Sequence, residues 1–311
     1  MKKIVIISPC FNEEKNIINF YSRLKKHLSK INGYKFSIIF IDNNSTDNTV
    51  NEINNLIIKD CSVSLIKNKI NFGHIKSPYW GLIQSEGDAT ILISSDMQEP
   101  PELIEDLLSK WNNGADVVLG KKNKSKTNIV MHELRKTYYR MLNLISENKL
   151  QNDTTGFGLY SKQVIHQLRK IDEKYPYLRG LISDLGCKVE TVDYVQQKRV
   201  NGITKNNFFT LYDTAMLGIV KHSFLPIRIV TMLGFLIGAI SLLTSIYYFI
   251  YKIINWNGFE LGVAPVVIGM FFILGLILIF IGIIGEYIIN ITRLIDKKPI
   301  VVEEYRKGKW E

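Results

Sequence analysis

The sequence has little cysteine. Cys10, Cys61 and Cys187 are the only three among 311 residues, and no two of them have CxxC spacing. An odd and scattered set argues against a disulfide framework and against a zinc site, and it favours a reducing compartment. The opening residues also do not have the pattern of a signal peptide, because the apolar run at 4–7 is too short and polar residues follow at 12–14. We therefore expect a first β-strand there.

Acidic residues are fewer than basic ones. The sequence has 39 lysines and arginines against 29 acidic residues, which gives a net charge of +10 and a pI near 9.3. This excess suits nucleic acid, anionic lipid or a phosphorylated ligand, and does not choose among them. The length of 311 residues allows one large domain and a smaller module.

Charge is absent from two long segments near the C-terminus. Residues 229–251 are 23 consecutive uncharged residues, and residues 261–285 are 25. A helix needs roughly 20 residues to cross a hydrocarbon core of about 30 Å. Buried soluble helices are the alternative, but two such runs separated by only 252–260 favour a transmembrane hairpin over 226–292, with helices at about 229–251 and 261–288.

The charges around this hairpin predict its orientation. Basic residues gather after the second run, in the tail 293–311, whereas the loop 252–260 has only Lys252 and Glu260. By the positive-inside rule, both ends of the hairpin and the large N-terminal region face the cytosol. The GxxxG pattern at 234–238 permits close helix contact and suggests a homo-oligomer.

Apolar segments alternate with amphipathic ones in the first 120 residues. We expect strands at 3–8, 36–41, 63–66, 89–93 and 116–119, and helices at 13–29, 50–57, 78–85 and 101–111. Such alternation predicts an α/β fold with a doubly wound, mainly parallel sheet.

Polar clusters follow three of these strands. In an open parallel sheet, the strand ends would bring 9–13, 42–47 and 94–98 around one crevice. Clustered carboxylates raise each other's energy unless a cation or a hydrogen-bonding ligand lies among them, and Mg²⁺ or Mn²⁺ suits oxygen ligands. The alternative for Asp96 is an ordinary turn that carries an aspartate.

The order of these motifs resembles glycosyltransferase family 2. The matching segments are 8–14 (SPCFNEE), 41–47 (IDNNSTD), 71–73 (NFG), 96–102 (DMQEPPE), 177–181 (YLRGL), 199–205 (RVNGITK) and 285–288 (GEYI), with Lys298-Pro299 beyond them. More narrowly, the chain resembles the polyprenyl-phosphate glycosyltransferases, the group that includes dolichol-phosphate mannose synthase and the bactoprenol glucosyltransferases. The resemblance spans nearly the whole chain.

The resemblance implies a GT-A catalytic domain at 1–205 and a set of site residues. The residue matching Asp42 contacts the base in that family, Asp96 and Gln98 match a site for Mg²⁺ or Mn²⁺ and the diphosphate, and Asp96, Asp153, Arg199 and Lys205 are the expected catalytic residues. The expected nucleotide-sugar site comprises Pro9, Asn12, Glu13, Asp42, Asn44, Asp47, Asn71, Ser94, Asp96 and Gln98.

Two motifs depart from the family pattern. The usual Asp-x-Asp reads Ser94-Ser95-Asp96, so one expected carboxylate ligand is absent. The usual Gly-Asp-Phe-Arg reads Thr155-Gly156-Phe157-Gly158, so its Asp and Arg are absent, which leaves the role of Asp153 open. Metal would then be held by Asp96, Gln98 and the diphosphate alone, or lysines would take a larger share.

The acceptor side is expected in the second half of the chain. Arg199 offers a planar fork and Lys205 a point charge for a lipid phosphate, although two ordinary surface cations are the alternative. We expect a turn-rich stretch at 151–160 on the acceptor side. At 206–225 we expect an amphipathic helix lying along the membrane surface, with a core helix as the alternative.

Together these features predict inverting transfer of a single sugar from a nucleotide sugar, with UDP favoured, to undecaprenyl phosphate. The protein would be a multi-pass enzyme of the inner membrane with a cytosolic catalytic domain, would supply a lipid-linked donor for cell-envelope glycans, and would have no nucleic-acid partner. Three alternatives stay open: a processive polysaccharide synthase, since 196–199 is similar to Gln-x-x-Arg-Trp but Val200 replaces the Trp; a transferase acting on a glycan or protein; and an inactive scaffold. The sugar itself is left open.

Overall fold

The computed structural model describes residues 1–122, 154–197, 216, 225–254, 263–295 and 298–309. These residues divide into two units. The first unit contains the described residues up to 197 together with 298–309. The second contains residue 216 and two long helices, α9 (Leu225–Ile254) and α10 (Val263–Ile295).

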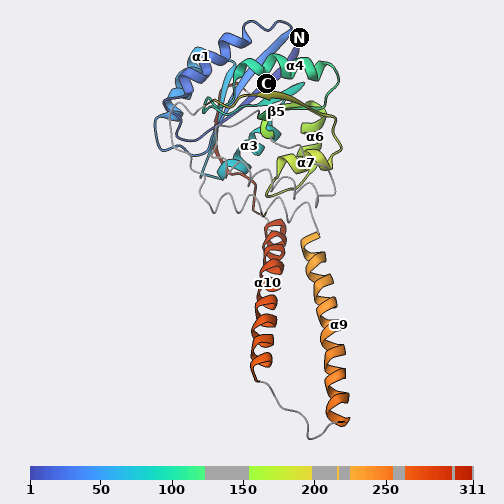
Figure 1. Ribbon diagram of the computed structural model, residues 1–311. Helices are drawn as coiled ribbons and strands as arrows, with labels where there is room; N and C mark the ends of the chain where they lie inside the picture. The colour runs from blue at the N-terminus through green and yellow to red at the C-terminus, as the bar shows by residue number, and fades with distance from the viewer. Residues whose placement is uncertain (123–153, 198–215, 217–224, 255–262, 296–297, 310–311) are drawn as a thin grey trace. The chain divides into compact units, whose positions relative to one another are not determined.

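An eight-stranded mixed sheet forms the centre of the first unit (Figure 1). Its order is β7-β5-β6-β4-β1-β2-β3-β8. The pairs β1–β2, β1–β4, β2–β3 and β5–β7 are parallel, and β4–β6, β5–β6 and β3–β8 are antiparallel. The predicted α/β class with a mainly parallel sheet is therefore confirmed. The strands are β1 (Lys2–Cys10), β2 (Tyr34–Asp42), β3 (Val63–Asn68), β4 (Ala89–Leu92), β5 (Val117–Lys122), β6 (Thr154–Ser161), β7 (Val189–Tyr194) and β8 (Glu303–Lys307).

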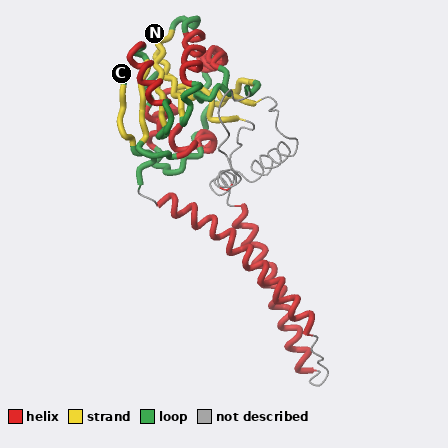
Figure 2. The backbone as a smooth tube through the Cα atoms, turned by 90° about the vertical axis from the view of Figure 1, so that its left-hand side faces the viewer, coloured by secondary structure: helices red, strands yellow, loops and turns green. Residues whose placement is uncertain are grey.

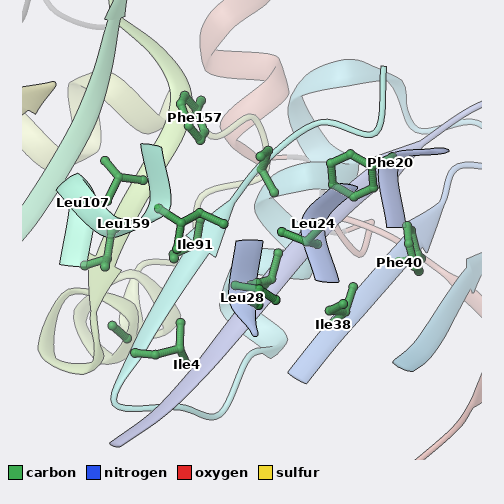
Figure 3. Packing of buried hydrophobic residues seen from close by; sticks show 14 of the residues in the cluster. Ile4, Phe20, Leu24, Leu28, Ile38, Phe40, Ile91, Leu107, Phe157 and Leu159 are labelled. Carbon is green, nitrogen blue, oxygen red and sulfur yellow. The ribbon is translucent and has the colours of Figure 1, made fainter. Parts of the chain in front are cut away.

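Helices cover both faces of this sheet because its strands are apolar on both sides. Ile4 and Ile6 of β1 pack into one core and Val5 and Ile7 into the other. The first core, seen in Figure 3, is completed by α1, α2 and α4, and the second by α3, α6 and α7. The helices are α1 (Ile17–Leu28), α2 (Thr49–Lys59), α3 (Gly73–Gln84), the 3₁₀ helix η1 (Pro101–Leu103), α4 (Ile104–Asn112), α6 (Lys162–Lys170) and α7 (Leu178–Asp184).

The first strand extends beyond its predicted end. We expected it to stop before Pro9, yet β1 continues through Pro9 to Cys10. Proline has no N–H to give to a neighbouring strand. Strand β4 pairs with β1 only as far as Ile7, so the missing N–H does not interrupt that ladder, and the carbonyl of Pro9 accepts a hydrogen bond from Ser95 Oγ at 3.1 Å.

Two helices begin elsewhere than predicted. Helix α1 starts at Ile17 rather than at residue 13, because the carbonyl of Glu13 accepts the N–H groups of Asn16 and Ile17 in a preceding turn. Helix α3 starts at Gly73, so Pro78 lies inside it and does not begin it.

The prediction of a turn-rich acceptor segment at 151–160 was wrong for the residues that the structure describes. Residues 154–161 form strand β6, which lies between β4 and β5. Its glycines, which usually signal a turn, serve a close approach here. A Cβ atom on Gly158 would lie against the backbone of Val118 and 3.0 Å from Cα of Leu119. Only glycine fits that point of the sheet.

The segment 293–311, which we expected to be a basic tail, also contributes a strand to the sheet. Residues 303–307 form β8, which pairs with β3 at the sheet edge. Just before this strand, Ile300 and Val301 are buried in the second core. Glu303 accepts a hydrogen bond from the Trp80 indole, and Glu304 lies 2.7 Å from Lys67 Nζ. The end of the chain is thus part of the first unit.

Helices α9 and α10 are 30 and 33 residues long and run side by side as a hairpin (Figure 2). They overlap the predicted helices at about 229–251 and 261–288. Among the described residues, no helix is both long enough and apolar enough to qualify as a membrane span. The membrane assignment therefore stays a prediction, and most of the expected interfacial helix at 206–225 lies outside the described residues.

Candidate active site

The carboxyl ends of β4, β1 and β2 meet at one edge of the sheet. These strands are neighbours in the order β4-β1-β2, with Ile7 opposite Leu92 and Cys10 opposite Asp42. The three polar segments at 9–13, 42–47 and 94–98 therefore lie together, as the sequence predicted. Open α/β sheets bind ligands at such an edge.

Asp42 is the last residue of β2 and is fully buried. Its carboxylate accepts hydrogen bonds from the Ser45 N–H at 3.0 Å and from Ser45 Oγ. Burial raises the pKa of this carboxyl, and the bonds from Ser45 and the charge of Lys67 offset only part of that effect. A carboxylate kept in such a place at a cost in stability is typical of a functional group.

Ser45 also connects Asp42 to the first loop. Its hydroxyl oxygen accepts the N–H of Asn12 at 2.9 Å while it donates to Asp42. In return, Asn12 Oδ1 accepts the N–H of Thr46 at 2.8 Å. These bonds fix the loops after β1 and β2 against each other, so that a ligand would meet both in a set geometry.

Glu13 and Asp47, both predicted to bind nucleotide, serve the protein's own loops. Glu13 is buried, its N–H donates to Thr49 Oγ1 at 2.8 Å, and its carboxylate accepts from Asn16. Asp47 accepts the N–H of Thr49 at 3.0 Å and the N–H of Glu14 at 3.2 Å. Asp47 thus stabilises the start of α2, in the manner of an N-cap.

Asn71 is held by a residue that the sequence did not single out. Asn43 Nδ2 donates to Asn71 Oδ1 at 2.8 Å, and Asn43 Oδ1 accepts from Asn68 at 3.1 Å and from the Phe72 N–H at 2.9 Å. Asn43 is buried and lies next to Asp42. It therefore fixes the loop after β3 onto the site. Its signal in the sequence was only its place in an Asp-Asn-Asn-Ser run, which is typical of side chain-to-backbone bonding.

The loop after β4 is closed by its own acidic residues. The Ser94 N–H donates to Glu99 Oε2 at 2.9 Å, and Asp96 Oδ1 accepts the N–H of Gln98 at 3.2 Å. The Gln98 side-chain oxygen accepts a hydrogen bond from Gln196 at 3.0 Å. This loop places Asp96 and Gln98 at the same edge as Asp42.

Three residues other than glycine have a positive φ among the described residues, and each lies in one of these loops. They are Asn12 (φ 56°), Asn44 (φ 65°) and Met97 (φ 63°). This left-handed conformation costs energy for residues with a Cβ, and such strain concentrates at functional sites. The strain marks the same three segments as the polar clusters do, by an independent criterion.

The donor set of Asp96 and Gln98 fits a hard cation that is held largely by its substrate. The described residues contain no group of three His, Cys, Asp or Glu side chains arranged for a metal. Mg²⁺, however, is usually bound through one or two carboxylates plus substrate phosphates and water. One carboxylate and one amide oxygen satisfy that requirement if a diphosphate supplies the rest.

The other predicted catalytic and acceptor residues, Asp153, Arg199 and Lys205, lie outside the described residues.

Comparison with known proteins adds independent observations. The family model described as "Glycosyl transferase family 2" matches residues 5–169. The SfII prophage-derived bactoprenol glucosyl transferase of Shigella flexneri is 32% identical over 308 residues, which cover 98% of this chain and 99% of the relative. The bactoprenol glucosyl transferase of Shigella phage SfV is 33% identical, with 99% of this chain and 100% of the relative covered.

Among solved structures, glucosyl-3-phosphoglycerate synthase from Mycobacterium tuberculosis, in complex with Mn²⁺, UDP and phosphoglyceric acid, is similar with a TM-score of 0.50. It is 18% identical, and the match covers 70% of this chain and 76% of that chain. At this identity the similarity concerns the fold alone.

The raised pKa of Asp42 predicts how the stability of an Asp42→Asn variant depends on pH. Because folding raises this pKa, the folded state loses stability as the pH rises from the unfolded pKa of the carboxyl through its folded pKa. Each tenfold change in the acid dissociation constant corresponds to about 1.4 kcal/mol. The free energy of unfolding of Asp42→Asn, relative to the parent protein, should therefore rise from pH 3.5 to pH 7. Denaturant unfolding at both pH values measures it, with the exposed Asp106→Asn as the control. A difference that does not change with pH would contradict the account.

Proposed function

The chain belongs to glycosyl transferase family 2, and on that premise we propose that it transfers one glucose from UDP-glucose to bactoprenol phosphate, the undecaprenyl phosphate of bacteria. One observation carries the proposal: the two bactoprenol glucosyl transferases match over at least 98% of this chain. The family model ends at residue 169, so the match to these two relatives also includes the residues after 169 that the family model does not cover.

The donor's base would bind beside Asp42. A carboxylate has about four lone-pair positions, and the N–H of a uracil ring would compete for one of them with the weak contact from the Cys10 thiol at 3.9 Å. Asn12 and Asn44, held in left-handed conformations, would shape the walls of this pocket together with Pro9. The strain in the loops would then be compensated by the contacts that these loops make with the nucleotide.

The diphosphate would lie toward Asp96 and Gln98. When bound there, Mg²⁺ or Mn²⁺ supplies positive charge to the departing nucleotide diphosphate. Asp96, buried in its loop and bonded to the Gln98 N–H, holds a fixed carboxylate oxygen for this purpose. Ser94 adds no second carboxylate, which is consistent with a cation bound mainly through the diphosphate.

The acceptor requires orientation more than deprotonation. A phosphate monoester has a second pKa near 6, so at neutral pH it is mostly the dianion and is already a nucleophile. Arg199 and Lys205 are proposed to hold it in line with the anomeric carbon, where direct displacement inverts the configuration. No general base is then needed, which would explain how the chain tolerates the altered Gly-Asp-Phe-Arg motif.

Helices α9 and α10 are proposed to anchor the enzyme in the cytoplasmic membrane. The support for this proposal is in the sequence, where the uncharged runs at 229–251 and 261–285 each exceed the roughly 20 residues that cross a hydrocarbon core. Large apolar side chains such as Phe235, Met232 and Met270 are exposed along them. Contiguous exposed apolar surface marks a membrane or protein contact. The basic residues after α10 would keep the catalytic unit in the cytosol.

Glucose transfer is tested directly with the purified full-length protein. Incubation with radiolabelled UDP-glucose and undecaprenyl phosphate should give one lipid product carrying one glucose, with GDP-mannose and UDP-N-acetylglucosamine as comparison donors. Asp96→Asn should lower kcat/KM on the order of 100-fold, because it weakens stabilisation of the departing diphosphate. The exposed Asp106→Asn should stay within about twofold. A ladder of longer products, or full activity of Asp96→Asn at saturating Mn²⁺, would contradict the proposal.

The orientation of the catalytic unit can be read from its exposed cysteine. Cys61 is exposed, Cys187 is partly buried and Cys10 is buried. In a Cys187→Ser background, a membrane-impermeant maleimide should label Cys61 in inside-out vesicles and not in intact spheroplasts. Adding Cys61→Ser should remove the signal. Strong labelling in intact spheroplasts would place the unit on the opposite side.

A further inference from the structure

A glutamine from a distant segment reaches the proposed diphosphate loop. Gln196 follows the end of β7 by two residues, and its side-chain Nε2 donates to Gln98 Oε1 at 3.0 Å. The next residue continues the contact, because the Gln197 N–H donates to the Gln98 carbonyl at 3.2 Å. Both the backbone and the side chain of Gln98 are therefore bonded to the 196–197 segment.

Helix α1 contacts residues near both partners of this bond in the sequence. Arg23 forms a forked pair with Glu102, at 2.7 and 3.0 Å, and also donates to Gln197 Oε1 at 3.1 Å. His27 lies 2.9 Å from the same glutamate. Arg23 thus contacts both Glu102 and Gln197, so the Gln98–Gln196 bond connects two segments that each bond to α1.

The hydrogen bond from Gln196 determines the orientation of the Gln98 side-chain amide. A free glutamine can turn its oxygen or its NH₂ group toward a ligand, whereas the NH₂ of Gln196 requires the Gln98 oxygen on its side. That oxygen keeps a second lone pair, which is available to a cation. Partners of this kind orient metal ligands, and their loss usually costs 10–100-fold in metal affinity.

We propose that Gln196 is a positioning residue that orients the Gln98 amide oxygen toward a divalent cation bound with the nucleotide diphosphate. This inference rests on the proposed function, since it needs a cation and diphosphate at Asp96 and Gln98. It also gives a reason why one carboxylate suffices there. The amide oxygen that complements Asp96 is set in place by a hydrogen bond, which compensates for the carboxylate missing at Ser94.

The experiment measures UDP binding instead of turnover. Isothermal titration calorimetry of the full-length protein in detergent, over a series of Mn²⁺ concentrations, gives the Mn²⁺ concentration at half-maximal affinity for UDP. Gln196→Met keeps the length of the side chain and removes its donor, so this concentration should rise about 10–100-fold. Gln167→Met, at an exposed position of α6, makes the same exchange away from the site and should leave it unchanged.

A double variant separates positioning from a purely structural role. If Gln196 acts through Gln98, Gln98→Met should raise the required Mn²⁺ concentration and the second substitution should add little to it. The inference would be overturned if the two substitutions raised the required Mn²⁺ concentration independently of each other. It would also be overturned if UDP affinity depended on Mn²⁺ in Gln196→Met as it does in the parent protein. UDP binding by the parent protein that is unchanged by a chelator would overturn it as well. A parent protein that binds no UDP under any condition would instead overturn the proposed function itself.

Discussion

A buried carboxylate at the junction of two parallel strands is the constraint around which the site is organised. Burying a charge is costly unless hydrogen bonds compensate for lost water. The chain supplies them by winding the loop after β2 around Asp42, so that Ser45 donates twice to it. Because Ser45 also accepts the N–H of Asn12, the same interaction fixes the loop after β1. One unfavourable burial thus sets the geometry of two loops.

The same principle extends along the edge of the sheet. Asn43 fixes the loop after β3, and Glu99 and Gln98 close the loop after β4. The strain of the left-handed residues is compensated by these bonds, and the result is a rigid arrangement of donors and acceptors before any ligand arrives. Such preorganisation suits a reaction in which charge moves from a sugar to a departing diphosphate, because fixed dipoles need no rearrangement in the transition state.

The sequence predicted what depends on local pattern. The alternation of strands and helices, and the grouping of Asp42 and Asp96, follow from periodicity and from the geometry of parallel sheets. It failed where a distant partner decides the outcome. In the sequence Gly158 predicts a turn, and its role becomes clear only from its close approach to the backbone of Val118 in the structure. Similarly, β8 forms by pairing with the edge strand β3, which the sequence does not indicate. The bond between Gln98 and Gln196 likewise joins residues 98 positions apart, which no local pattern encodes.

Hydrogen–deuterium exchange with and without UDP tests the central claim most directly, because it reports which backbone segments the nucleotide covers. The account predicts slower exchange at 10–14, 42–47 and 94–98 when UDP and Mn²⁺ are added, and no change in the turns at the opposite edge of the sheet, at 31–33 and 86–88. Protection confined to that opposite edge, with the three loops exchanging as before, would contradict it.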